Sequence, residues 1–192
     1  ASAAVVSSPV TYSAEDASLE LTPLGSFETG VFDESAAEIV ATHGDRLFVV
    51  NAQAGSVSVL DWSDPTAMTE LFAIASTGTA NSVAVREDGL GVIAFEAEDK
   101  TAPGSLVFFD AEADSPTILG SVTVGALPDM VTVSADGMYA VVANEGEPAD
   151  DYTSDPEGSI GVVTLPSTKT APAQGDVRLA DFHAYESDGG KT

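Results

Sequence analysis

Carboxylate and amide side chains recur at equivalent places in three short, similar segments of the chain. In each segment, one such side chain stands at the start of an apolar run and another at or just after the end of the next run. The three pairs are Glu38 with Asn51, Asn81 with Glu96, and Asp129 with Asn144. If the two runs pair as antiparallel strands, the members of each pair meet at one edge. Oxygen ligands of this kind are those that hard cations prefer.

Two acidic loops extend this pattern, because they leave from the same edge. One contains Glu96, Glu98 and Asp99, and the other reads NEGEPADDYTSDPE from Asn144. The predicted metal ligands are Glu38, Glu96, Asp129 and Glu145, with a supporting polar ring of Asn51, Asn81 and Asn144 and loop acids Glu147, Asp150, Asp151, Asp155 and Glu157. We expect Ca²⁺, or else another divalent metal. In the alternative interpretation, these side chains only cap strand ends and loop backbone groups. Their spacing does not match the EF-hand pattern.

Other chemistry has little support in the sequence. The chain has no cysteine, which excludes disulfides, zinc–thiolate sites and thiol nucleophiles. It has no G-x-S-x-G motif for a hydrolase nucleophile. We expect His43 in a hairpin turn on the opposite face, and we see no partner for His183 in the C-terminal segment.

The candidate ligands lie within a repeat of short apolar runs separated by Gly, Asp, Asn, Pro and Ser. The repeats begin at Glu38, Asn81 and Asp129, and their spacing of roughly 40–50 residues is typical of β-propeller blades. The third run of each repeat is nearly the same: GSVSVLD, GSLVFFD and GSIGVVTL. We therefore predict an all-β fold, a β-propeller of four-stranded antiparallel blades. Three blades are too few to close a ring.

The repeat divides the chain into segments. We expect a flexible N-terminal segment (1–18), a strand that closes the last blade of the full ring (19–34), three blades (35–78, 79–126 and 127–186) and a linker or truncation point (187–192). An open set of blades exposes sheet edges and apolar faces. The predicted partners are therefore the remaining blades, as a longer chain or a second polypeptide.

The chain is strongly acidic, with 6 Lys+Arg against 31 Asp+Glu and a net charge of −25. This charge keeps a protein soluble in a salty or extracellular setting, and it also attracts cations. It argues against nucleic acid as a partner, because phosphates select a positive surface. No apolar run approaches the roughly 18 residues of a membrane helix. The small, polar N-terminal residues resemble the end left after removal of a signal peptide, or a trimmed end.

Several segments are similar to the choice-of-anchor I family of secreted propellers: Gly30–Val40, Phe48–Asp61, Ala80–Val85, Val124–Met130 and Val142–Ser159. The last of these, with NEGEP, DDY and DPEGS, is the most specific. The resemblance covers residues 19–186. The family includes alkaline-phosphatase-like proteins and mesenchyme-specific cell-surface glycoproteins. The resemblance implies a secreted or surface-anchored propeller, seven-bladed and longer than this chain.

Two functions follow from different arguments. The first is a Ca²⁺-dependent phosphomonoesterase, in which the metal would neutralise phosphate charge and polarise a water molecule. The second is a non-catalytic surface or matrix module that binds a cation, mineral, glycan or protein. Phosphate binding calls for basic residues, and we expect Arg46 and Arg86 on hairpins at the other face. This shortage weakens the enzyme interpretation for these residues.

Overall fold

The computed structural model describes residues 2–4, 14–19, 21–30 and 37–185 of the chain. Within these ranges the chain forms three four-stranded antiparallel sheets, one two-stranded sheet and two short 3₁₀ turns. In the same ranges, no helix is long and apolar enough to cross a membrane. The predicted all-β class is therefore confirmed.

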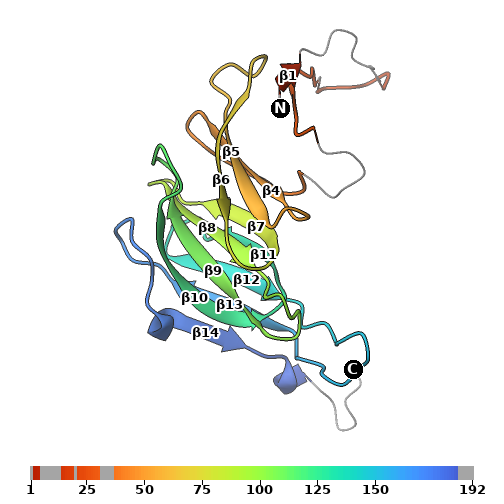
Figure 1. The fold of residues 1–192 in the computed structure, drawn as a ribbon, viewed down its shortest axis with the longest axis vertical. Coiled ribbons are helices and arrows are strands. Elements are labelled where there is room, and N and C mark those ends of the chain that lie inside the picture. Colours follow the sequence, from red (N-terminus) through yellow and green to blue (C-terminus); the bar gives the residue numbers. More distant parts are fainter. Residues whose placement is uncertain (1, 5–13, 20, 31–36, 186–192) are drawn as a thin grey trace.

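The three large sheets follow one another along the chain, and each is a simple up-and-down meander (Figure 1). The first blade contains β3 (Val40–His43), β4 (Arg46–Asn51), β5 (Ser56–Asp61) and β6 (Thr69–Ala75). The second contains β7 (Ala80–Val85), β8 (Leu90–Phe95), β9 (Pro103–Asp110) and β10 (Ile118–Ala126). The third contains β11 (Pro128–Val133), β12 (Tyr139–Asn144), β13 (Ser159–Thr164) and β14 (Val177–Ala180). These are the predicted four-stranded antiparallel blades.

The N-terminal region forms a separate small sheet, in which β1 (Ser2–Ala4) pairs with β2 (Ser26–Glu28). The strand expected over residues 19–34 is thus represented by β2, which is hydrogen-bonded to β1 and not to a blade. Residues 20 and 31–36 of that segment lie outside the described residues, as do much of 1–18 and all of 187–192. The role of this strand in closing a ring stays a prediction.

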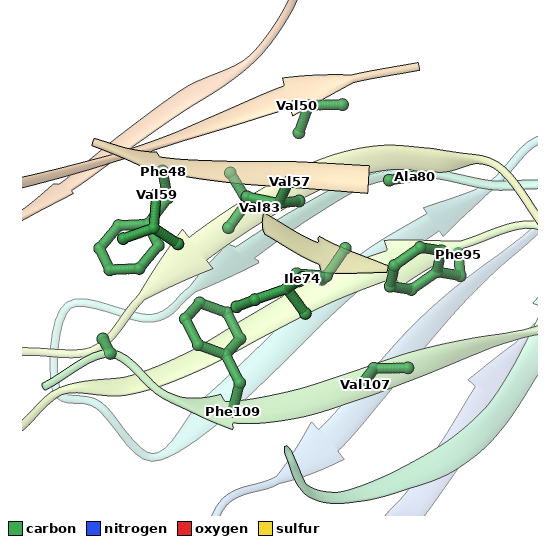
Figure 2. Close-up of a cluster of buried hydrophobic side chains, with 12 residues drawn as sticks. Phe48, Val50, Val57, Val59, Ile74, Ala80, Val83, Phe95, Val107 and Phe109 are labelled. Carbon is green, nitrogen blue, oxygen red and sulfur yellow. The ribbon is translucent and has the colours of Figure 1, made fainter. Parts of the chain in front are cut away.

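The core lies between successive blades. One buried cluster joins the first and second blades, and Figure 2 shows Phe48, Val59 and Ile74 pointing toward Phe109 of β9. The Phe48 and Phe109 ring centroids are 5.3 Å apart. A second cluster joins the second and third blades. Because the second blade is covered on both faces, β8 is buried along its whole length, and its sequence is a continuous apolar run.

The tight turns between the first and second strands distinguish the two ends of each blade. In the turn between β7 and β8, Asp88 Oδ1 accepts a hydrogen bond from the Leu90 N–H at 3.2 Å. In the turn between β11 and β12, Asp136 does the same for Met138 at 3.0 Å. This contact explains the repeated Asp-Gly in the sequence. We call the end with these turns the hairpin face, and the opposite end, with the loops after β4, β8 and β12, the acidic face.

Candidate cation-binding site at the acidic face

The second blade contains a complete amide–carboxylate pair at the acidic face. Asn81 lies at a β-bulge, where the register between β7 and β8 shifts. Its Nδ2 donates to Glu96 Oε2 at 3.2 Å and to the Pro128 carbonyl oxygen, also at 3.2 Å. Pro128 begins β11, so the Asn81 amide also ties the second blade to the third. The structure thus brings together the predicted pair, Asn81 and Glu96.

The third blade has two carboxylates at the same two positions. Asp129 lies at the bulge between Pro128 and Met130, and Glu145 directly follows β12 as Glu96 follows β8. The backbone confirms this equivalence, because the Glu145 N–H donates to the Leu127 carbonyl at 2.9 Å and the Glu96 N–H to the Thr79 carbonyl at 3.0 Å. The donor that Asn81 supplies is therefore replaced by an acceptor, Asp129.

This replacement has an electrostatic consequence. Desolvation of its carboxylate raises the pKa of Glu145, and repulsion from Asp129 and Glu147 raises it further. Like charges at one site favour either a proton or a cation between them. Asp129, Glu145 and Glu147 therefore form the part of the acidic face that favours positive charge.

The first blade lacks such a pair. The Glu38 N–H donates to the Val50 carbonyl at 3.1 Å, which places Glu38 at the same edge, with an exposed side chain. Asn51 ends β4, and the residue after it is Ala52, where the other blades have Glu96 and Glu145. The first blade therefore contributes one carboxylate to the acidic face at these positions.

Of the three amides predicted to form a polar ring at the acidic face, two are instead buried within the sheets. Asn51 Nδ2 donates to Ser58 Oγ at 2.8 Å, and Asn144 Nδ2 donates to Ser159 Oγ at 3.2 Å. Asn144 is only 3% exposed and lies against Gly125 of β10, where an added Cβ would be 2.7 Å from its Cγ. The Oδ1 atoms of both amides have no hydrogen-bond partner in the described part of the chain.

Several predicted loop acids are engaged with nearby groups. Lys100 binds Asp150 at 2.9 Å and Glu147 at 3.7 Å, which ties the acidic loop of the third blade to the second blade. Asp151 accepts from the Thr153 N–H and hydroxyl. Glu157 lies 2.8 Å from His183 Nε2, so the histidine does have a partner, contrary to the expectation from sequence. Asp155 is exposed and lines a shallow hollow with Glu157 and His183.

The predicted ligands have the oxygen atoms that a hard cation prefers, but they do not surround a common point. Between residues 37 and 185, and in the shorter described ranges, no three His, Cys, Asp or Glu side chains are grouped to hold a metal ion. The predicted ligands Glu38, Glu96, Asp129 and Glu145 come from three different blades, and Glu96 is bonded to Asn81. Asp129 and Glu145 are the two that lie close to each other. Ca²⁺ as the ligand stays a prediction.

The hairpin face carries most of the described basic side chains, and sequence reasoning missed their role. Arg86 is buried and bonds Asp88 in its own turn and the Gly137, Pro166 and Thr168 carbonyls of the third blade. Arg46 likewise reaches from the first blade to the Ala111 carbonyl and Asp114. Lys169 binds Asp110 and Glu112 of the second blade, and Glu112 also contacts His43.

A hollow with a volume of about 740 Å³ lies at this hairpin face. It is lined by Arg86, Asp88, Asp136, Leu165 and Pro166, among others. The Arg86 guanidinium donates to three carbonyls and one carboxylate. These contacts occupy its donors, so the hollow does not present a positive group to an anion. The arginines of this face join neighbouring blades.

Three consecutive four-stranded antiparallel blades with polar loops at both ends place the chain among the β-propellers. The sequence profile of the choice-of-anchor I domain matches residues 38–191. The chain belongs to the choice-of-anchor I domain family. A comparison with curated proteins finds no match.

Solved structures resemble the chain in fold. Hydrazine synthase from Kuenenia stuttgartiensis matches with a TM-score of 0.52 and 20% identity, over 73% of this chain and 36% of that chain. A functionally unknown protein from Desulfotomaculum acetoxidans DSM 771 matches with a TM-score of 0.49 and 14% identity, over 81% of this chain and 50% of that one. The chain thus spans between a third and a half of these structures. At this identity, the likeness concerns the fold alone.

Proposed function

We propose that the chain is part of a secreted or cell-surface β-propeller, completed by further blades, whose acidic face binds Ca²⁺ without catalysis by these residues. One observation carries the proposal: the Asn81–Glu96 hydrogen bond of the second blade is replaced by two carboxylates, Asp129 and Glu145, in the third. A bound cation would neutralise this pair. Glu147 would contribute a further oxygen, and the resemblance to secreted propellers supports the location.

The geometry favours weak, exchangeable binding. Asp129 and Glu145 are both exposed, so water would complete the coordination of a cation there. Ca²⁺ takes six to eight oxygen ligands and accepts irregular geometry, whereas Mg²⁺ demands a near-octahedral shell. Extracellular modules bind Ca²⁺ with dissociation constants of about 10⁻⁴–10⁻³ M. We expect this chain to fall in that range and to prefer Ca²⁺ to Mg²⁺.

The alternative, a Ca²⁺-dependent phosphomonoesterase, gains less support from these residues. A bound metal would stabilise charge on a phosphate and polarise water, but basic side chains usually share that work. Lys100 and His183 both lie beside the acidic loop, but both are already engaged with its carboxylates, Lys100 with Asp150 and Glu147 and His183 with Glu157. Phosphatase activity therefore stays a prediction for the whole propeller.

Calorimetric titration of the chain with CaCl₂ tests the proposal. The variant Asp129→Asn recreates the amide–carboxylate arrangement of the second blade, so it should weaken Ca²⁺ binding at least tenfold without removing a hydrogen-bonding group. Glu98→Gln removes the same charge from an exposed position in the neighbouring loop, and its affinity should stay within twofold of the parent chain.

The same titration can refute the site. Equal losses for Asp129→Asn and Glu98→Gln would mean that Ca²⁺ only screens the acidic surface. Absence of any saturable binding below about 10 mM, beyond the range of extracellular modules, would refute the proposal. MgCl₂ titrations serve as the ion control.

A further inference from the structure

The three blades end in outer strands whose free edges are protected in different ways. An uncovered edge exposes unpaired backbone groups that can pair with a strand of another molecule, and charges, bulges or short length oppose this. β6 carries Glu70 and a bulge at Leu71, and β14 has only four residues, including Arg178. β10, in contrast, has nine residues, ILGSVTVGA, and none of them is charged. The outer strand of the second blade is therefore the one that most needs a cover.

A connection of the third blade lies along this strand. The chain between β13 and β14, residues 165–176, has 12 residues, whereas the equivalent connections of the first and second blades (62–68 and 111–117) have seven each. We call residues 165–176 the strap. In Figure 1 the blue chain of the strap lies next to β10. The extra length lets this connection reach the second blade.

Contacts with the second blade hold the strap in place along its length. At its start, the Arg86 guanidinium donates to two of its carbonyl oxygens, at 2.7 and 3.1 Å. Lys169 then forms ion pairs with Asp110 and Glu112, at 2.8 and 2.6 Å. The position of the strap therefore does not depend on a single contact.

The strap meets β10 at both ends of its regular stretch. The register with β9 is regular from Gly120 to Thr123 and shifts on either side. At Gly120, an added Cβ would lie 2.8 Å from the Ala171 Cβ, so the strap packs directly on the strand. At Thr123, Gln174 Oε1 accepts from the backbone N–H at 2.8 Å, and Gln174 Nε2 donates to the carbonyl oxygen at 3.0 Å. The Gln174 side-chain amide thus bonds β10 as a residue of an added strand would.

We propose that the strap closes the outer edge of the second blade against pairing with β10 of a second molecule, and that Gln174 is the residue that blocks this edge. Both backbone groups of Thr123 point away from β9, and an added strand would use these groups. The proposal goes beyond the proposed function and does not depend on it, because no residue of the strap belongs to the candidate cation site.

Two observations favour a guard over a simple tie between blades. Gln174 and Thr123 are both exposed, so water can replace their two hydrogen bonds at little cost in stability, but water does not exclude a strand. The net charge of −25 also keeps copies of the chain apart, but salt screens that repulsion. A blocked edge protects the molecule at any ionic strength.

Hydrogen exchange and light scattering on the full-length protein test the proposal together. Gln174→Ala should speed exchange of the Thr123 amide about tenfold, as loss of one hydrogen bond does. It should also cause an association that the parent lacks and that increases with protein concentration and with NaCl. Lys169→Met is the matched control. It removes the ion pairs to Asp110 and Glu112 but leaves Gln174 in place, so it should scatter light like the parent protein.

A second substitution shows whether β10 is the strand that pairs. Thr123→Pro removes an N–H that points outward and takes no hydrogen bond from the pairing with β9, and edge strands accept proline at such positions. In the Gln174→Ala background it should restore the light scattering of the parent. The Tm of each variant, which should stay close to that of the parent, shows that the variants fold.

Four results would overturn the proposal. Unchanged exchange at Thr123 in Gln174→Ala would mean that the strap does not cover the edge. Faster exchange without association would mean that the strap only ties two blades together. Equal association of Lys169→Met would contradict the role of Gln174. Association that persists in the Gln174→Ala/Thr123→Pro double variant would mean that another surface is responsible.

Discussion

At the bulge position of the acidic face, the amide of Asn81 in the second blade is replaced by the carboxylate of Asp129 in the third. Asn81→Asp should convert the Asn81–Glu96 pair into a second acid pair like Asp129 and Glu145. The variant loses hydrogen bonds to Glu96 and to the Pro128 carbonyl, so Ca²⁺-free stability should fall by about 1–3 kcal/mol. Calorimetry should then show a second Ca²⁺ equivalent and a larger Ca²⁺-induced rise in Tm than in the parent chain.

The matched control for this variant is Asn81→Ala. It removes the same hydrogen bonds without adding a charge, so it should destabilise the chain but leave the Ca²⁺ stoichiometry unchanged. If both variants respond to Ca²⁺ alike, the acid pair is not what binds the ion.

Arg86 is the residue on which the junction of the second and third blades depends most at the hairpin face. Arg86→Ala leaves the Gly137, Pro166 and Thr168 carbonyls and Asp88 without this donor. We expect a loss of about 2–4 kcal/mol in the free energy of unfolding. Urea titration followed by Trp62 fluorescence measures it.

Arg178→Ala is the control for this loss of charge and side-chain volume. Arg178 is exposed and, within the described residues, donates to nearby carbonyls, those of Gly175 and Val177. Its removal should change stability by less than about 0.5 kcal/mol. A similar cost for both variants would mean that Arg86 contributes only as a surface cation.

At the scale of strands, the junction between the first and second blades depends on a glycine beneath an aromatic ring. Gly91 of β8 pairs with Phe109 of β9, and an added Cβ would overlap the Phe109 ring. That ring is also packed on Phe48 of the first blade. Gly91→Ala should therefore displace the ring and cost about 1–3 kcal/mol, as overpacking of a core does.

Chemical denaturation of three further variants checks this explanation. Gly175→Ala adds the same methyl group where no atom lies within 4 Å, so it should be nearly neutral. Phe109→Leu and the double variant complete a mutant cycle, in which the smaller side chain should recover part of the Gly91→Ala loss. If the stability losses of Gly91→Ala and Phe109→Leu simply add in the double variant, the cost of Gly91→Ala arises in the strand backbone and not from the Phe109 ring.

The strands also show how far the sequence could predict this molecule. The repeated Gly-Ser third strand and the Asp-Gly turns depend on local chemistry, so blade number, strand order and the meeting of Asn81 with Glu96 could all be predicted. The bulges at Asn81 and Asp129 could not, because they shift the register by one residue without a sequence signal.

Contacts between blades were harder still to predict. Lys100 meets Asp150 and Arg86 meets the Pro166 carbonyl across 50 and 80 residues of sequence. Such contacts depend on the conformations of two loops at once. A basic residue in a turn of a very acidic chain is the only local signal that could have suggested them.

For the whole molecule, the net charge of −25 predicts an unusual dependence of stability on pH. The pKa of Glu145 is raised in the folded chain, so its negative charge destabilises the fold at neutral pH. This destabilisation is lost as the pH falls toward 4.5, the ordinary pKa of a glutamate. Asp88 has a pKa lowered mainly by its hydrogen bonds with Arg86, so its stabilisation is present above 3.8 and is lost below it. Stability should therefore rise from pH 8 toward about pH 5 and collapse below about pH 4.

Thermal unfolding from pH 3 to pH 8 at low ionic strength measures this profile. We expect Tm to rise slightly between pH 8 and pH 5, because protonation of Glu145 relieves its repulsion from Asp129 and Glu147. In 1 M NaCl, where the screening length is about 3 Å, the rise should largely disappear while the collapse at low pH remains. Ca²⁺ at millimolar concentration should flatten the rise in the parent chain more than in Asp129→Asn. A rise that persists unchanged in 1 M NaCl would contradict repulsion as its cause.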